Sequence, residues 1–338
     1  MYEFLNSFNS NEFERFVQTH ENGSFMQSRL WANVKANWIS EGVISRDRSG
    51  KVRGTCLVLT KKTPLIHSAL MYAPRGPVCG RSDGAATSDI SEGLDALAEK
   101  YRSFAFICDP PIVLTENSPL VDLGTQTKGR EVQCRFNYVL NLNGKSLSEI
   151  RASFKSEYRN RINKAIRRGV YCEELRGENA LNALSGFYEL MIQTGRRDGF
   201  PIRSEEYFAR FISALGEHAS LFMCYADING KTPLSGAITV NYGGRFSYVY
   251  GASSDSHREL YPNYLMQQTM IDAAIERHCC VYDFGGVPFF YDESRREYGM
   301  YRFKKGFGGE IVSYAGQFTK IYRPVLSRAA VLFSEFSR

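Results

Sequence analysis

The chain repeats one order of predicted elements, and this repetition limits the folds open to it. The first half has a helical pattern at Arg29–Trp38, strand patterns at Val52–Leu59 and Ser68–Tyr72, an amphipathic helix at Asp89–Arg102 and a buried strand at Phe104–Cys108. Two prolines follow this last strand and end its pairing. The predicted order is therefore helix, mostly antiparallel sheet, helix, short buried strand.

The second half shows the same order. Strand patterns at Leu221–Asp227 and Leu234–Asn241 flank Asn229-Gly230, a strong hairpin signal. A helix at Pro262–Arg277 and a buried strand at Val281–Phe284 follow. Only the order of elements repeats, not the residues, so we expect an α/β (α+β) chain made of two similar units.

The size and composition agree with two soluble units. A length of 338 residues is long for a single hydrophobic core. No apolar run reaches the roughly 18 residues that a membrane helix needs, and the N-terminus lacks the pattern of a signal peptide. The eight cysteines and five histidines have no zinc-type spacing, so we expect reduced thiols and no metal site. Together these features predict a cytoplasmic protein.

The net charge of +6 is concentrated in one segment. Residues Arg151–Arg168 hold seven basic residues and one acid, Glu157. An i, i+4 apolar spine predicts a helix packed by one stripe, made of Phe154, Tyr158, Ile162 and Ile166. A solvated face is the usual fate of such charges, but cations with so few acids beside them favour a polyanionic partner, either nucleic acid or a membrane surface. The candidate binding residues are Lys155, Arg159, Arg161, Lys164, Arg167 and Arg168.

A glycine corner in the second half precedes a lysine pair. Tyr282–Gly286 reads as a buried strand with a glycine turn, and Tyr301–Gly309 as a short helix that carries Lys304 and Lys305. A cation at the open end of a sheet suits a developing negative charge, although a solvated lysine pair has the same pattern. The sequence lacks a Walker A loop, a nucleotide-binding glycine motif and a nucleophile elbow. Asp283-Phe284-Gly285 spells a kinase triplet, but the Gly-rich loop and the His-Arg-Asp loop of a kinase are missing. An enzyme of this sequence would therefore work by positioning reactants and stabilising charge.

Several stretches along the chain carry a family resemblance through their order and spacing. They are Ser28–Trp38, Tyr72–Val78, the basic helix Phe154–Gly169, Pro201-Ile202-Arg203 with Tyr207-Phe208, Tyr248–Gly251, Tyr282–Gly286 and Phe303-Lys304. Together they resemble the Fem family of aminoacyltransferases, which build the peptide cross-bridge of bacterial peptidoglycan. The resemblance extends over most of the chain.

The resemblance implies two acetyltransferase-like (GNAT) domains, which we place at residues 1–143 plus 318–338 and at residues 144–317, and it implies no cofactor. The donor would be an aminoacyl-tRNA, which fits the basic helix. The acceptor would be the side-chain amine of the third residue of the peptidoglycan stem peptide, on UDP-MurNAc-pentapeptide or lipid II. By resemblance, Lys35 and Arg203 match pyrophosphate-binding positions, with Tyr207 and Tyr250 beside them.

The resemblance also assigns the residues of the transfer step. Lys304 matches the family lysine at the acyl-transfer site, and we assign it to the oxyanion or to the tRNA end, with Phe303 shaping the wall. Asp109 matches a family aspartate at a strand end, where it would take the amine proton or, equally, cap the turn before the prolines. The sequence has no pair of long charged helices, so we expect no coiled-coil arm and a form closer to compact FemX. A lipid-linked acceptor stays open, and with it peripheral membrane contact.

Two other functions stay open on the sequence alone. A Fem-like transferase that acts on a peptide natural product would keep the tRNA donor but would have no pyrophosphate for Lys35 and Arg203. A non-catalytic RNA- or membrane-surface-binding protein would use only the Arg151–Arg168 helix and would tolerate substitution of Lys304.

Overall fold

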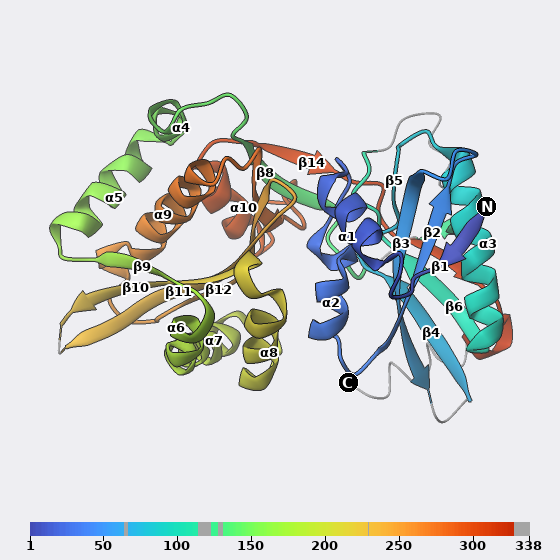
Figure 1. The fold of residues 1–338 in the computed structure, drawn as a ribbon. Coiled ribbons are helices and arrows are strands. Elements are labelled where there is room, and N and C mark those ends of the chain that lie inside the picture. Colours follow the sequence, from blue (N-terminus) through green and yellow to red (C-terminus); the bar gives the residue numbers. More distant parts are fainter. Residues whose placement is uncertain (64–66, 114–122, 128–130, 229, 328–338) are drawn as a thin grey trace. The chain divides into compact units, whose positions relative to one another are not determined.

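The computed structural model describes residues 1–63, 67–113, 123–127, 131–228 and 230–327 (Figure 1). The chain forms two compact units, Met1–Arg135 with the chain from Ser313 onward, and Phe136–Val312. The predicted boundaries differ from these, because residues 136–143 lie in the second unit and residues 313–317 in the first. Strand β8 (Phe136–Asn141) pairs with the second sheet, whereas backbone bonds from Tyr314 to Arg135 and from Ala315 to Ile112 tie the later segment to the first unit.

The first unit is built on one sheet of strand order β1-β2-β3-β4-β6-β15-β7, in which β5 also pairs with β3. The strands are β1 Tyr2–Phe4, β2 Ile39–Arg46, β3 Val52–Thr63, β4 Ser68–Ala73, β5 Val78–Cys79, β6 Ser103–Cys108, β7 Thr125–Gln126 and β15 Phe318–Ile321. The helices are α1 Ser10–Thr19, α2 Arg29–Val34 and α3 Gly84–Lys100, with a 3-10 turn at Phe25–Gln27. Strands β4 and β6 run parallel because α3 connects them.

Helix α3 shows how the first unit is held together. The Asp83 side chain caps the helix by accepting the Ala86 N–H. The buried face of α3 includes Ile90, Leu94 and Leu97, which belong to one apolar core with strand residues such as Phe106. Burial of each such side chain stabilises the fold by about 1.5–3 kcal/mol.

The second unit contains a sheet of strand order β14-β8-β13-β12-β11-β10-β9. Its other strands are β9 Tyr171–Leu175, β10 Ala219–Asp227, β11 Lys231–Tyr242, β12 Arg245–Ser253, β13 Val281–Gly286 and β14 Glu310–Ser313. Its helices are α4 Leu147–Ser153, α5 Ser156–Arg167, α6 Gly177–Asn182, α7 Leu184–Asp198, α8 Glu205–Leu215, α9 Pro262–Glu276 and α10 Tyr298–Lys305, with 3-10 turns at Gly216–His218 and Arg258–Leu260. Strands β12 and β13 are parallel and are connected by α9.

The predicted fold class is confirmed, since each unit combines antiparallel strands with one strand–helix–strand crossover to a parallel neighbour. The hairpin of β10 and β11 is present, with Asp227 opposite Lys231, while Asn229 lies outside the described residues. Within the described residues the longest helix is α3, at 17 residues, and none is long and apolar enough to cross a membrane.

Three local predictions were wrong. The helix predicted at Arg29–Trp38 ends at Val34, and strand β2 follows it at Ile39 without having been predicted. The basic segment breaks at Phe154, whose extended backbone (ψ 145°) separates α4 from α5, and α4 begins earlier, at a capping box of Ser146. Ile166 is exposed, and Ala165 takes its place on the buried stripe of α5.

Candidate active site in the second unit

The buried lysine of the second unit rests on a glycine corner. Strand β13 bulges between Asp283 and Gly286, and Gly285 has a φ of 80°, which favours glycine. Lys304, at 5% exposure, donates from Nζ to the Gly286 carbonyl at 2.7 Å. Its neighbour Lys305 is exposed and lies over the Tyr301 ring. The structure thus separates the two lysines and buries Lys304.

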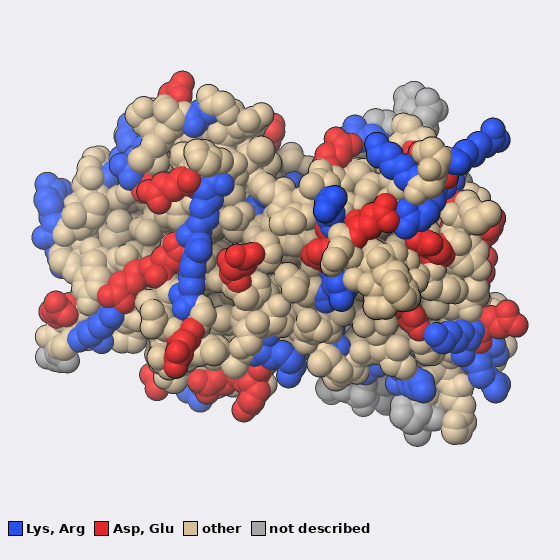
Figure 2. All heavy atoms as spheres, viewed as in Figure 1, with Lys and Arg blue, Asp and Glu red and all other residues tan. Residues whose placement is uncertain are grey.

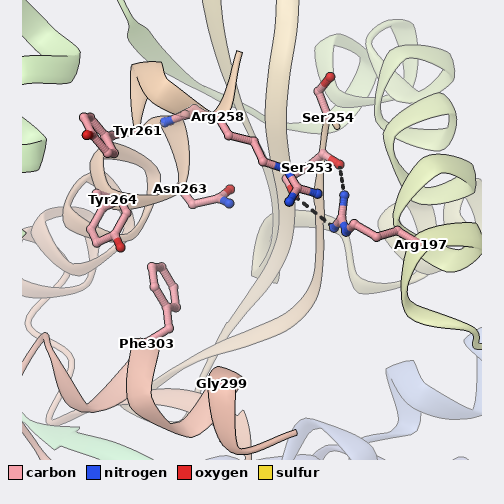
Figure 3. A pocket seen from close by; sticks show the side chains of 10 residues that line it. Arg197, Ser253, Ser254, Arg258, Tyr261, Asn263, Tyr264, Gly299 and Phe303 are labelled. Atoms are coloured by element: carbon pink, nitrogen blue, oxygen red, sulfur yellow. Dashed lines mark hydrogen bonds between the residues drawn. The ribbon is translucent and has the colours of Figure 1, made fainter. Parts of the chain in front are cut away.

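A pocket of about 490 Å³ lies beside Phe303, the residue before this lysine (Figure 3). Strand β12 pairs with β13 only as far as Ser247, so its later residues leave the parallel partner. Four elements or their flanking residues provide the walls: the end of α7, the end of β12, the start of α9 and helix α10. The lining residues are Arg197, Ser253, Ser254, Arg258, Tyr261, Pro262, Asn263, Tyr264, Gly299 and Phe303.

The pocket has a basic wall and an aromatic wall. Arg197 donates to the Ser253 carbonyl at 3.0 Å and to the Asp255 carboxylate at 2.6 Å. Arg258 also donates to Asp255, at 2.9 Å. Figure 3 shows Tyr264 and Phe303 on the side away from Arg197, and their ring centres are 5.3 Å apart. The pocket therefore suits a ligand that combines a negative charge with a flat ring.

The basic helix α5 reaches this pocket through one residue. The Arg161 guanidinium lies 4.9 Å from the Tyr264 ring centre and 5.5 Å from that of Tyr261, and it donates to the Tyr264 hydroxyl. Cation–π contacts of this kind fix the arginine at the pocket edge. Arg168 follows α5 and donates to the carbonyl of Glu259, which is next to the lining residue Arg258 but does not itself line the pocket, at 2.7 Å.

Of the other predicted cations in this segment, one bonds to the protein backbone and three are exposed. Arg159 donates to the Ala152 carbonyl at 2.9 Å and so caps the end of α4. Lys155, Lys164 and Arg167 are exposed. Figure 2 shows Lys and Arg side chains along the outer side of the α4–α5 region, at the left of the view. The helix thus offers a charged outer face that continues to the pocket edge.

The predicted tyrosine pair lies together on α8 and β12. The Tyr207 and Tyr250 hydroxyls are 3.1 Å apart, and the Arg203 guanidinium is 5.4 Å from the Tyr207 ring centre. Burial raises the pKa of both tyrosines, which keeps their hydroxyls protonated and able to donate. Arg210, one turn further along α8 and 5.8 Å from the same ring, was not predicted. The sequence could have indicated Arg210, because its i, i+3 spacing from Tyr207 puts the two residues on one face of a helix.

Two of the predicted site residues belong to the first unit. Lys35 ends α2, and its Nζ is 4.9 Å from the ring centre of buried Trp31. Asp109, at 2% exposure, follows β6 and accepts the Tyr72 hydroxyl at 2.7 Å and the Arg75 N–H at 2.6 Å. Burial raises the pKa of the Asp109 carboxyl. This carboxylate holds the turn that follows β4, where Arg75 has a φ of 53°.

Comparison with known proteins identifies the class. A family model described as the FemAB family matches residues 8–119, 121–232 and 229–334. The chain belongs to the FemAB family. It is 27% identical to a lipid II:glycine glycyltransferase of Staphylococcus haemolyticus, over 91% of this chain and 90% of that protein.

Solved structures agree with this relationship. A crystal structure of FemX matches with a TM-score of 0.86 and 25% identity, over 97% of this chain and 99% of the other. A tandem GNAT protein from the clavulanic acid pathway matches with a TM-score of 0.56 and 9% identity, over 95% and 98% of the two chains, which shows the fold alone. The predicted family and the predicted class of enzyme, an aminoacyltransferase, are confirmed. No group of potential metal ligands occurs among the described residues.

Proposed function

We propose that the chain transfers an amino acid from an aminoacyl-tRNA to the side-chain amine of the third residue of a peptidoglycan stem peptide, and so forms the cross-bridge. The acceptor would be UDP-MurNAc-pentapeptide or lipid II. The observation that carries the proposal is the contact of Arg161, from the basic helix, with two aromatic residues of the pocket wall. Because a tRNA ends in a single strand that continues from a helical stem, it requires a stacking pocket joined to a basic surface.

The pocket would take the 3′ end of the tRNA. Arg197 and Arg258 would meet its phosphates, because a planar guanidinium pairs with phosphate oxygens. Tyr264 and Phe303 would stack on a base, which contributes about 1–3 kcal/mol per base. The exposed face of α5 would neutralise phosphates of the stem, through Lys155, Arg159, Arg161, Lys164, Arg167 and Arg168.

The reaction would proceed by attack of the stem-peptide amine on the ester carbonyl of the aminoacyl-tRNA. The new C–N bond forms first and gives a tetrahedral intermediate, whose collapse breaks the C–O bond to the terminal ribose. The amine loses a proton to a base, and the departing ribose oxygen gains one. Lys304 would stabilise the oxyanion of the tetrahedral intermediate or hold the last nucleotide, with Phe303 forming the wall. Asp109 is our candidate for the proton acceptor, and the raised pKa of its buried carboxyl supports this assignment.

Arg203, Tyr207 and Tyr250 are our candidates for binding the pyrophosphate of the acceptor, and Lys35 is a further candidate. The charge of the two cations and the protonated tyrosine hydroxyls support this role. The name of the staphylococcal relative favours lipid II as the acceptor and makes glycine the first amino acid to test. We accordingly expect a cytoplasmic enzyme, with peripheral membrane contact when the acceptor is lipid-linked.

The test is a transfer assay with purified protein, glycyl-, alanyl- or seryl-tRNA, and each acceptor in turn. The expected product is heavier by one aminoacyl residue in mass spectrometry, and ribonuclease treatment of the donor abolishes it. If no donor and acceptor pair gives this product, the proposal is refuted. Transfer to another peptide without binding of UDP-MurNAc-pentapeptide would instead establish the natural-product alternative.

A further inference from the structure

Beneath the lysine corner, Asp283 forms the centre of a hydrogen-bond cluster that the proposed reaction does not use directly. Its side chain is 10% exposed. Its two carboxylate oxygens both accept from Asn137 Nδ2, each at 3.1 Å, and Oδ2 also accepts from Arg245 Nη1 at 3.1 Å. Asn137 lies on β8 and Arg245 on β12, so Asp283 ties its own strand, β13, to both neighbours.

The same carboxylate fixes the glycine corner. Its Oδ1 accepts the Gly285 N–H at 2.8 Å, within the bulge between Asp283 and Gly286. A Cβ added to Gly285 would lie 3.4 Å from the Tyr248 carbonyl and 3.9 Å from Lys304 Nζ, so this peptide lies directly beside the ammonium. The next carbonyl, that of Gly286, is the one that accepts Lys304 Nζ at 2.7 Å.

We propose that Asp283 is a positioning residue for Lys304, acting through the Gly285–Gly286 backbone. Two hydrogen bonds fix the corner on either side of its glycines. The Val287 N–H, which shares a peptide with the Gly286 carbonyl, donates to the Phe136 carbonyl on β8 at 2.8 Å. The Gly285 N–H donates to Asp283 and so fixes the preceding peptide, where Gly285 has a positive φ and lies in the bulge, and the Asn137 and Arg245 contacts hold Asp283 in place. The inference rests on the proposed role of Lys304 in the transfer step.

The test compares Asp283→Ala with Asp283→Asn. Asp283→Ala removes the acceptor of the Gly285 N–H, and we expect kcat to fall about 10- to 100-fold with KM for both substrates nearly unchanged, because a small misplacement of a catalytic group lowers rate more than binding. Asp283→Asn keeps a carbonyl oxygen for that N–H and is expected to recover most of kcat. A role in stability alone predicts instead that kcat at low temperature is unaffected.

The matched control is Asp272→Ala. Asp272 is 16% exposed and pairs with Arg151 in the same unit, so its loss removes a comparable ion pair, here between α9 and α4 rather than at the lysine corner. Turnover of Asp283→Ala within about threefold of this control would overturn the inference. If Asp283→Ala does not fold, Asn137→Ala replaces it, since it leaves the Arg245 pair intact. A smaller loss of kcat is then expected, and no loss would overturn the inference.

A crystal structure of the variant separates this inference from the proposed function. In Asp283→Ala, or in Asn137→Ala where that variant replaces it, Lys304 Nζ is expected to move by more than about 0.5 Å from its place on the Gly286 carbonyl. An unchanged Lys304 would overturn the inference even where the wild-type protein transfers amino acids. A wild-type protein without transferase activity would refute the proposed function, while the position of Nζ would still decide the inference.

Discussion

Replacement of Lys304 by Met tests the proposed chemistry most directly. Methionine keeps an unbranched side chain of similar length and removes only the ammonium, which lies 2.7 Å from the Gly286 carbonyl in a residue of 5% exposure. Loss of one charge-stabilising donor in such a site lowers kcat by about 10²- to 10³-fold, or about 2.7–4 kcal/mol. The melting temperature should change little, because the lost hydrogen bond is offset by removal of a buried charge.

The assay is single-turnover transfer from charged tRNA, with binding of each substrate measured separately. Lys305→Met is the matched control, because Lys305 is the exposed neighbour on the same helix and is expected to keep full turnover. Turnover of Lys304→Met within about threefold of the wild-type enzyme, or an equal loss in Lys305→Met, would remove Lys304 from the mechanism.

Three further predictions concern the other predicted residues. Replacing Lys164 and Arg167 by Ala should weaken tRNA binding and lower the slope of log K against log salt by about two, whereas Lys231→Ala on the β10–β11 hairpin should leave both unchanged. Arg203→Ala should weaken binding of UDP-MurNAc-pentapeptide, measured by calorimetry, by about tenfold while the free pentapeptide binds as before; an equal loss for both would contradict the pyrophosphate role. Burial raises the pKa of the Asp109 carboxyl above 3.8, so the folded protein holds this proton more tightly than the unfolded chain does. The free energy of unfolding that this difference contributes is lost as pH rises from near 3.8 through the raised pKa. Denaturant titrations across acidic pH should show that Asp109→Asn flattens this part of the profile, and an unchanged slope would refute the assignment.

Residues close in the chain were predicted well because their signals are local. Glycine at Gly285 permits a positive φ, the hairpin signal lies between two strand patterns, and the amphipathic stripe of α5 follows from its period. The break at Phe154 was missed because the i, i+4 spacing of buried apolar residues continues through it, from Ile150 to Tyr158. Strand β2 was missed because the turn before it, residues 35–38, contains no glycine or proline to mark the end of the helix.

By itself, the sequence determined the repeated α/β order, the concentration of charge before β9, and the motifs that resemble the Fem family. It did not determine which lysine of the pair is buried, because neighbouring residues on a helix point about 100° apart and only packing decides which one is covered. The pocket beside Phe303 and the contact of Arg161 with its wall join residues far apart in the chain. Asp283 likewise read as part of a strand, and only the pairing of β13 with both β8 and β12 places it beneath the carbonyl that holds Lys304.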